Sequence, residues 1–399
     1  MKRLNRTRVF LVASAGALVL ASPAAMADKV DYAYDAAGRL TSANYSNGGS
    51  LIRYAYDPAG NILSKVIFTN SDVTSFEDIT GDSTPDLAGF VRDNLGRPNI
   101  VVYSGATGSV QSTFGFLNAK WNNFAIGTVR DANQDGTAND PAAAVLAVNN
   151  ETGKMRVEAR RVDNGALVSS VLFLNEKWRA VDIVVVDDAN GDGNTSDTAV
   201  AVLAERLSDG RIQLQLRDLD TGSLISNTVY FNARWTPIAA AVADRSAVAP
   251  AGTLPPLISV IAHNAENGKR LMQSRVAGSG AFDQNIKFLG AAWDYQDVSV
   301  NHDADGNGTN DDPIWQVLAT RSSDKVARVQ TRRISDGSFD RNIAVLNANW
   351  QTFRLDTSPD IGGSNAQEMV ISATRRADGV GRIHVKDYGT GATTINIAP

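Results

Sequence analysis

The chain has 399 residues, of which 43% are hydrophobic and 20% charged, and its formal net charge is -5. This composition is that of a globular protein, and it argues against a disordered chain and against a nucleic-acid-binding surface. Cysteine is absent, and the only histidines are His263, His302 and His384. Disulfides and thiol catalysis are therefore excluded, and there is little from which to build a histidine zinc site or a catalytic triad.

The first 27 residues have the organisation of a secretory signal. Basic residues begin the chain, an apolar run covers residues 9–21, and Ala25-Met26-Ala27 supplies small residues for a cleavage site. We expect a mature bacterial protein that begins near Asp28 and is secreted, periplasmic or held at the cell surface. An uncleaved membrane anchor is disfavoured because the apolar run is short and no second one follows.

Two similar segments occupy residues 28–66. Tyr32-Ala-Tyr-Asp35-Ala-Ala-Gly38-Arg39-Leu40 is followed by Tyr54-Ala-Tyr-Asp57-Pro-Ala-Gly60-Asn61-Ile62. Alternating tyrosines favour strands and Asp-x-x-Gly favours a turn, so each segment predicts a β-hairpin. The segments resemble the YD repeat of the Rhs family, in which long arrays enclose a toxin. Two copies cannot enclose anything, so we expect a short β-appendage on the domain that follows.

A longer repeat fills residues 67–399. Its tryptophans and turn glycines recur every 57 or 58 residues; they are Trp121, Trp178, Trp235, Trp293 and Trp350, and Gly108, Gly165, Gly222, Gly280 and Gly337. Each unit contains about four strand-like runs with tight glycine turns and no helical periodicity. Six such units predict an all-β, six-bladed β-propeller with a short N-terminal hairpin extension. A seventh blade built from residues 28–66 is the less favoured variant.

The repeated tryptophans have two interpretations. One large aromatic side chain at a fixed position of every blade would fill the widening space between adjacent blades. Alternatively, the indoles would stack on a ligand. We favour the packing role, in which each buried indole contributes on the order of a few kcal/mol.

Four units carry an acidic loop, and three of these loops begin ten residues after the tryptophan. Oxygen side chains at alternate positions, followed by glycine, provide the ligand geometry that Ca²⁺ requires. We therefore predict up to four Ca²⁺ sites, against the alternative of metal-free turns. The predicted ligands are Asp78, Thr80, Asp82 and Asp86; Asp131, Asn133, Asp135 and Asp140; Asp188, Asn190, Asp192 and Asp197; and Asp303, Asp305, Asn307 and Asp311.

These loops resemble the Ca²⁺ loops of FG-GAP repeats in integrin-α propellers and of bacterial VCBS-type repeats. The resemblance implies that Ca²⁺ lies between the first two strands of a blade. The chain departs from the family pattern at Ser83, which replaces the usual glycine, and at Asp140 and Asp197, which come one residue late. The fifth unit offers both Asp311 and Asp312 at the closing position. The fourth unit, from Asp244, breaks the pattern and predicts no metal. The sixth retains only Asp356 and Asp360.

Basic side chains stand five residues before the turn glycines, and an amide, acid or histidine precedes each by two residues. The basic residues are Arg160, Arg217, Arg275, Arg332 and Lys386, and their companions are Glu158, Gln215, Gln273, Gln330 and His384. On a strand each pair shares one face. The set is either a basic circle that binds an acidic glycan or peptide carboxylate, or a structural set in which each arginine pairs with an acidic loop of the neighbouring blade. We favour the structural set.

Taken together, the motifs predict a secreted, Ca²⁺-stabilised binding or adhesion module for an extracellular or cell-surface glycan or protein. We expect a monomer without nucleic-acid binding and without a transmembrane segment after signal cleavage. No nucleophile with an adjacent base is visible, and the paired carboxylates belong to the loops. The alternative is a polysaccharide lyase or hydrolase, which needs Lys, Tyr, His or Arg clustered at one mouth of the channel.

Overall fold

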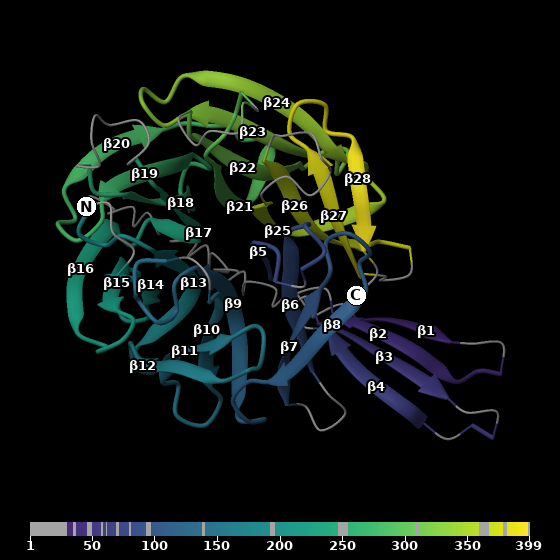
Figure 1. The fold of residues 1–399 in the computed structure, drawn as a ribbon. Helices are drawn as coiled ribbons and strands as arrows, with labels where there is room; N and C mark the ends of the chain where they lie inside the picture. The colour runs from purple at the N-terminus through teal and green to yellow at the C-terminus, as the bar shows by residue number, and fades with distance from the viewer. Residues whose placement is uncertain are drawn as a thin grey trace, which may run out of the picture.

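The computed structural model (Figure 1) describes residues 30–397, apart from some short segments. The segments left out are 35–36, 46–49, 57–58, 61, 69–71, 80, 93–96, 138–139, 192–195, 246–253, 306, 308–311, 359–366 and 378–380. The predicted signal, residues 1–27, lies outside the described residues, as do Thr80, Asp192, Asp311 and Asp360. Within the described residues no helix is long and apolar enough to cross a membrane.

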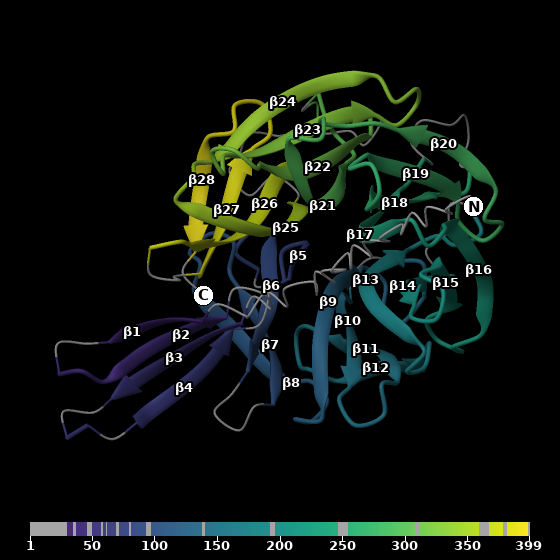
Figure 2. The same cartoon turned by 180° about the vertical axis from the view of Figure 1, so that it is seen from behind.

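The described elements are all β-strands, and the predicted six-bladed propeller is confirmed (Figures 1 and 2). The first three blades are β5 (Val73–Phe76), β6 (Asp86–Arg92), β7 (Pro98–Tyr103) and β8 (Val110–Gly115); β9 (Trp121–Val129), β10 (Ala142–Asn149), β11 (Met155–Arg161) and β12 (Leu167–Leu172); and β13 (Trp178–Val186), β14 (Ala199–Arg206), β15 (Ile212–Asp218) and β16 (Leu224–Phe231). The last three are β17 (Trp235–Ala243), β18 (Leu257–Asn264), β19 (Arg270–Val276) and β20 (Phe282–Ile286); β21 (Trp293–Asn301), β22 (Ile314–Arg321), β23 (Ala327–Arg333) and β24 (Phe339–Leu346); and β25 (Trp350–Ser358), β26 (Glu368–Arg375), β27 (Gly381–Asp387) and β28 (Thr393–Ile397). Each blade is one contiguous stretch of chain whose consecutive strands pair antiparallel.

The first strand of every blade lies at the centre of the ring. These strands contact one another in sequence, and β5 closes the circle by contacting both β9 and β25. The blades of the two chain ends share no strand, so side chains make this closure. Val73 and Leu87 of blade 1 pack with Val370 and Val385 of blade 6.

Hydrophobic clusters fill the space between every pair of adjacent blades. Four of the five repeated tryptophans pack against these clusters; they are Trp178, Trp235, Trp293 and Trp350. Trp121 is only 9% exposed and has the guanidinium of Arg156 over its ring. The turn glycines share the same interfaces. A Cβ on Gly165, whose φ is +71°, would lie 2.8 Å from the Cβ of Phe114 in the preceding blade.

The N-terminal extension consists of two antiparallel hairpins. They are formed by β1 (Val30–Tyr34) with β2 (Leu40–Tyr45), and by β3 (Ser50–Tyr56) with β4 (Ile62–Phe68). Gly38 and Gly60 occupy the turns with positive φ, as the Asp-x-x-Gly motif requires. β4 joins the second strand of blade 1 through the pair Ile67 and Arg92, and the extension projects from the ring beside that blade (Figures 1 and 2).

Candidate functional site

A bulge shapes the wall of the central channel. In β9, β13, β17, β21 and β25, the residue three positions after the tryptophan has no pairing partner on the second strand of its blade. Bulges redirect the side chains that follow them. The next position holds Ala125, Asp182, Ala239, Asp297 and Arg354, and its counterpart in blade 1 is Asp72. Carboxylates therefore stand on blades 1, 3 and 5.

The three aspartates join their own blade to the next one. In each, Oδ2 accepts a hydrogen bond from a backbone N-H of the following blade: Ile126 at 2.8 Å, Ala240 at 2.9 Å and Leu355 at 2.7 Å. Oδ1 accepts from the N-H of the following residue in its own blade. Two backbone donors hold each carboxylate in place.

Arg354 is the cation at the centre of this group. Its guanidinium lies 3.4 Å from Asp72, 3.9 Å from Asp182 and 3.7 Å from Asp297. Burial raises the pKa of Asp182 to about 6 and that of Asp297 well above its usual range, although Arg354 opposes both shifts. The three carboxylates raise the pKa of Arg354 against the effect of burial, so the arginine stays charged.

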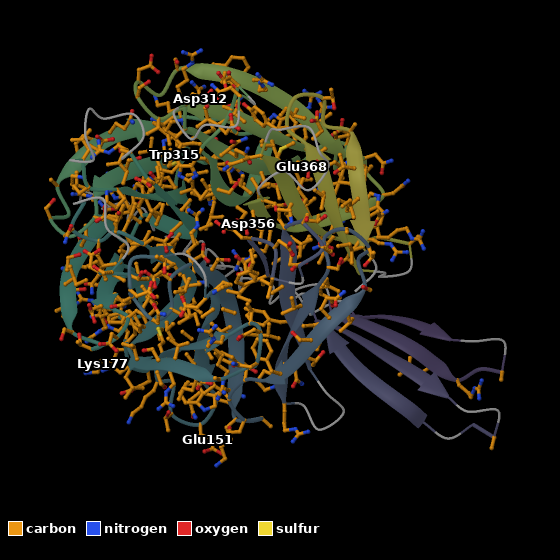
Figure 3. All side chains as sticks on the ribbon, viewed as in Figure 1. Glu151, Lys177, Asp312, Trp315, Asp356 and Glu368 are labelled. Atoms are coloured by element: carbon orange, nitrogen blue, oxygen red, sulfur yellow. The ribbon has the colours of Figure 1, made fainter. Side chains whose placement is uncertain are left out.

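Asp356 is a further buried carboxylate of the channel, and Figure 3 places it near the centre of the ring. The sequence pattern assigned it to the loop of the sixth blade, but it lies inside β25 and its Oδ2 accepts from the N-H of Ser75 at 2.8 Å. Burial raises the pKa of Asp356 to about 6. That loop assignment was wrong. Asp356 comes six residues after Trp350, whereas the loops of blades 2, 3 and 5 begin ten residues after their tryptophans.

One mouth of the channel is formed nine residues after each tryptophan. Arg130, Asp187, Asp244 and His302 occupy this position, and Glu77 is its counterpart in blade 1. Arg130 Nε lies 3.7 Å from Asp187 Oδ2, and His302 Nε2 accepts from the backbone N-H of Asp244 at 3.3 Å. Burial lowers the pKa of His302 to about 4, so the imidazole is neutral near pH 7.

The mouth and the bulge position together enclose a cavity of about 690 Å³. Its described lining contains no lysine and no tyrosine. The arginine and the histidine at the mouth are already engaged by Asp187 and by the N-H of Asp244. Within the described lining, the lysine and tyrosine on which the alternative lyase would draw are therefore missing, whereas carboxylates are abundant.

The described ends of the acidic loops have one feature in common in blades 2, 3 and 5. Their first and last aspartates form isolated bridges, which join Asp131 to Asp140, Asp188 to Asp197, and Asp303 to Asp312. The bridge ends at Asp312 in blade 5, one residue beyond the predicted ligand Asp311. In blade 1, Ser83 adopts a φ of 67°, which explains why the family pattern has glycine there.

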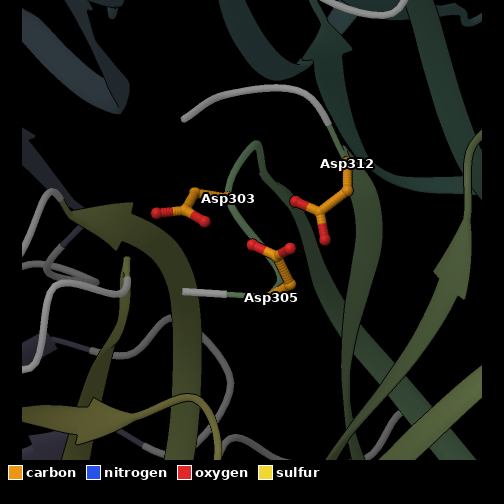
Figure 4. A group of neighbouring side chains, drawn as sticks. All are labelled: Asp303, Asp305 and Asp312. Atoms are coloured by element: carbon orange, nitrogen blue, oxygen red, sulfur yellow. The ribbon is translucent and has the colours of Figure 1, made fainter. Parts of the chain in front are cut away.

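Blade 5 has the donor set that best fits a cation. Single carboxylate oxygens of Asp303, Asp305 and Asp312 lie within 4.8 Å of one another (Figure 4). Asn307 turns back onto the same loop and donates its N-H to Asp303 at 3.0 Å. Three convergent carboxylates with an amide are ligands of the kind that Ca²⁺ takes.

In the other loops, the described ligands hydrogen-bond within or beside their own loop. In blade 1, Asp78 accepts from the N-H of Gly81 and Ser83, and Asp82 accepts from Ser104. In blade 2, Asp131 accepts from the N-H of Asp135, and Arg161 Nη1 lies 2.9 Å from Asp140 Oδ2. This arginine already supplies positive charge to one predicted ligand. In blade 3, Asp188 accepts from Gly191 and Asp197 from Asn190.

The fourth blade replaces the first loop aspartate with arginine. Asp244 is nine residues after Trp235, so the loop position itself belongs to Arg245. The Arg245 guanidinium donates to the carbonyl of Pro255 at 2.9 Å and lies 3.8 Å from Asp283. A side-chain cation therefore stands at the loop position of this blade.

The repeated arginines lie on the third strand of each blade, away from the channel. Nη1 of Arg160, Arg217, Arg275 and Arg332 donates to the carbonyl of its own turn glycine at 2.7–3.0 Å. Nε of Arg160 donates to Glu158, and Nε of Arg217 and Arg275 to Gln215 and Gln273. Lys386 is buried and donates to Thr393 at 2.6 Å.

Three of these arginines also stack on aromatic rings of the preceding blade. Arg217 lies 5.7 Å from the ring centroid of Phe173, Arg275 5.6 Å from that of Tyr230, and Arg332 5.6 Å from that of Phe288. Each arginine therefore reaches its neighbouring blade, as the structural interpretation predicts, but it meets an aromatic ring where an acidic loop was expected.

An exposed apolar residue stands directly opposite each of the four arginines in blades 2 to 5, and opposite Tyr103 at the same position of blade 1. The side chains on the outermost strands are Val110, Leu167, Leu224, Phe282 and Phe339, and they are 52–59% exposed. Arg275 also lies 5.8 Å from the ring of Phe282. We call the outer surface formed by these pairs the rim. Sequence reasoning missed this apolar row, although it keeps a constant distance of two residues after the turn glycine.

Comparison with known proteins finds one matching family model and many solved structures of similar fold. The RHS Repeat model matches residues 34–70, which cover the second hairpin and part of the first. No curated protein is a significant match to the chain. Among solved structures, AofleA from Arthrobotrys oligospora is 10% identical with a TM-score of 0.54, covering 83% of this chain and 87% of its own.

Two further solved structures are similar at low identity. A mutant of AofleA with three arginines replaced by alanine is 11% identical, with a TM-score of 0.54 over 83% of this chain and 87% of its own. A fungal lectin, the Aleuria aurantia lectin, described as a six-bladed β-propeller with a novel fucose recognition mode, is 10% identical, with a TM-score of 0.49 over 82% of this chain and 96% of its own. The two AofleA structures, with TM-scores of 0.54, show the likeness of fold.

Proposed function

We propose that the protein is a secreted, multivalent glycan-binding propeller whose binding sites lie on the rim, between adjacent blades. The observation that carries this proposal is the repetition of one polar and apolar group in successive blades. In blades 2 to 5 a half-buried arginine lies beside an amide or carboxylate and opposite an exposed apolar side chain. Repeated binding groups on a closed ring give avidity for a ligand that is itself repeated, as a surface glycan is.

The chemistry of each rim site suits a sugar. Arg217 and Arg275 each donate Nε to the nearby glutamine and Nη1 to the carbonyl of the turn glycine. Within the described residues, their Nη2 groups make no hydrogen bond. A planar guanidinium edge of this kind recognises hydroxyl or carboxylate oxygens. The adjacent Leu224 and Phe282 offer apolar surface to the C-H face of a sugar ring.

The AofleA comparison supports this interpretation without naming a ligand. The substitutions in its triple mutant fall on equally spaced arginines, and the arginines of this rim are also nearly equally spaced along the chain. The fold is shared, and the repeated arginine is the common feature. The identity of the sugar is therefore a question for binding experiments.

We further propose that Ca²⁺ stabilises the acidic loops. Bound Ca²⁺ would neutralise the convergent carboxylates, and in blade 5 Asp303, Asp305 and Asp312 would hold it. The loops lie at the mouth of the channel and the rim lies at the outer edge, so we assign the metal a structural role. Secretion follows from the predicted signal at residues 1–27.

The test is a glycan array probed with the wild type and two matched variants. Arg332 and Arg333 are consecutive residues of β23; Arg332 takes part in the rim, and Arg333 is exposed outside it. Arg332→Met should reduce binding to the glycans that the wild type recognises, whereas Arg333→Met should not. Equal binding by both variants, or the absence of any glycan ligand, would overturn the rim assignment.

A further inference from the structure

The wall of the central cavity is apolar on one side and polar on the other. Seven residues after the tryptophan, blades 3, 4 and 5 present Val185, Val242 and Val300 to the cavity. The corresponding residues of blades 6, 1 and 2 are Thr357, Ser75 and Thr128, and these also line it. A ligand that fills this belt needs both an apolar and a hydrogen-bonding surface.

Acidic groups lie on both sides of this belt. Toward the bulge position, three carboxylates (Asp72, Asp182 and Asp297) surround the guanidinium of Arg354, and Asp356 also lines the cavity. At the mouth, Glu77, Asp187 and Asp244 accompany Arg130. Over the whole lining there are ten carboxylates and three arginines, and eight carboxylates remain when Asp78 and Asp188 of the predicted Ca²⁺ loops are set aside. The protein's own cations therefore leave an excess of negative charge along the cavity wall.

Two buried polar atoms also lack partners among the described residues, one on Gln316, which contacts two lining residues, and one on Asp187 at the mouth. Gln316 is fully buried, and its Oε1 accepts from Ser299 at 3.2 Å and from Thr357 at 3.5 Å, both of which line the cavity. Its Nε2 makes no hydrogen bond, and neither does the buried Oδ1 of Asp187 at the mouth. Buried polar atoms without partners are costly, and a bound ligand or water can satisfy them.

We propose that the central cavity binds a linear aliphatic polyamine, with its ammonium groups at the two acidic levels and its methylene chain against the three valines. Asp356 and the mouth residues are three strand positions apart, which corresponds to about 10 Å of strand rise. An extended triamine has ammonium groups over a comparable length. A polyamine also presents N-H donors to the hydroxyls of Thr128 and Thr357.

The cavity argues against the other simple ligand classes. The lining carboxylates would repel an anion, and a neutral sugar would leave their negative charge uncompensated. A bare metal ion would neutralise charge but would leave most of the 690 Å³ and the valine wall without contacts. Polyamine binding does not depend on the rim, so this inference goes beyond the proposed glycan function.

The experiment is isothermal titration of the full chain with spermidine, in saturating Ca²⁺ and at moderate ionic strength. Asp244 is exposed at the mouth, and Asp244→Asn removes its charge but keeps the backbone N-H that donates to His302; it should weaken binding by about tenfold. Asp356→Asn should weaken it similarly. Glu151→Gln, which removes the same charge from the outer edge (Figure 3), should leave the affinity unchanged.

Three results would overturn the proposal. They are the absence of spermidine binding to the wild type, equal affinities for wild type and Asp244→Asn, and competition by additional Ca²⁺ or Mg²⁺ that is as effective as spermidine. The Arg332→Met variant should bind spermidine like the wild type. Loss of glycan binding in that variant with spermidine binding intact would show that the two sites are separate.

Discussion

The rim and the channel are built from the same six blades, but they use the repeat in opposite ways. On the rim, successive blades place the same kind of residue at the same position, as Arg217 and Arg275 show. In the channel, the position after the bulge holds alanine, aspartate or arginine, depending on the blade. Repetition suits many equivalent weak sites, whereas the differences in the channel create a single asymmetric site.

In the channel, odd and even blades differ at the position after the bulge. Asp72, Asp182 and Asp297 belong to odd blades, and each binds the backbone of the following even blade. The ring is therefore made of three blade pairs, and Arg354 stands where the other even blades have alanine. This single departure from the pattern holds the three carboxylates at one centre.

The largest effect should come from breaking that centre. Arg354→Met leaves three buried aspartates without their cation, and we expect a loss of about 3–5 kcal/mol in the free energy of unfolding. Urea denaturation measures it. Arg234→Met removes an exposed arginine that pairs with Glu266 at 3.5 Å, and should cost about 0–1 kcal/mol. Similar costs for the two variants would contradict the central role of Arg354.

Calcium removal should have the next largest effect. A ligand present at a hundred times its Kd stabilises the folded state by about 2.7 kcal/mol, so chelation should lower the Tm by several degrees. Asp305→Asn should lose part of this Ca²⁺-dependent rise in Tm, whereas Asp324→Asn, on an exposed turn of the same blade, should keep it. A Tm that is insensitive to chelator would mean that the loops are only turns.

The channel carboxylate Asp356 should give stability a dependence on pH. Its pKa is about 6 in the folded protein and 3.8 in the unfolded chain, so its contribution is complete below pH 3.8 and is lost as the pH rises through 6. Asp356→Asn removes this loss. Relative to wild type, the variant should gain up to about 3 kcal/mol between pH 4 and pH 8 in amine-free buffer. Parallel stability curves for the two proteins would contradict the assignment.

The smallest effect should come from a single rim site. In Arg217→Met the other rim arginines remain, so the number of binding sites should fall while the affinity of the remaining sites stays the same. Titration with a monovalent glycan measures the stoichiometry. On a glycan-coated surface the same substitution should lower the apparent affinity more, because avidity depends on several simultaneous contacts. A complete loss of monovalent binding would argue for one site in place of many.

The sequence was informative wherever a feature repeats. The tryptophan and glycine registers predicted six blades, and the Asp-x-x-Gly motifs predicted the two hairpins, because both depend on local chain geometry. The residues of the channel were not recognised, since Asp72, Asp182 and Arg354 come together only when the ring closes. Counting from the tryptophan would have aligned them, but their contacts depend on bulges that local sequence does not specify.

The partners of the rim arginines were predicted only in part. Their spacing indicated that they reach the neighbouring blade, but Phe173 and Tyr230 lie five residues before the tryptophans and were not recognised as a series. The exposed row that includes Leu224 and Phe282 was missed because isolated apolar surface residues are common. Only the comparison of all blades shows that this row is systematic.

The seam, which is the interface where β5 of the first blade contacts β25 of the last, determines how the order of the blades along the chain could be changed. Every blade is a contiguous segment, and β5 and β25 meet only through side chains such as Ser75 and Asp356. A circular permutation that joins the two ends of the propeller and cuts the chain between β16 and β17 would keep all six sheets intact and move the seam to another interface. Whole units could likewise be gained or lost by duplication or deletion of the coding sequence, provided that the ring can still close.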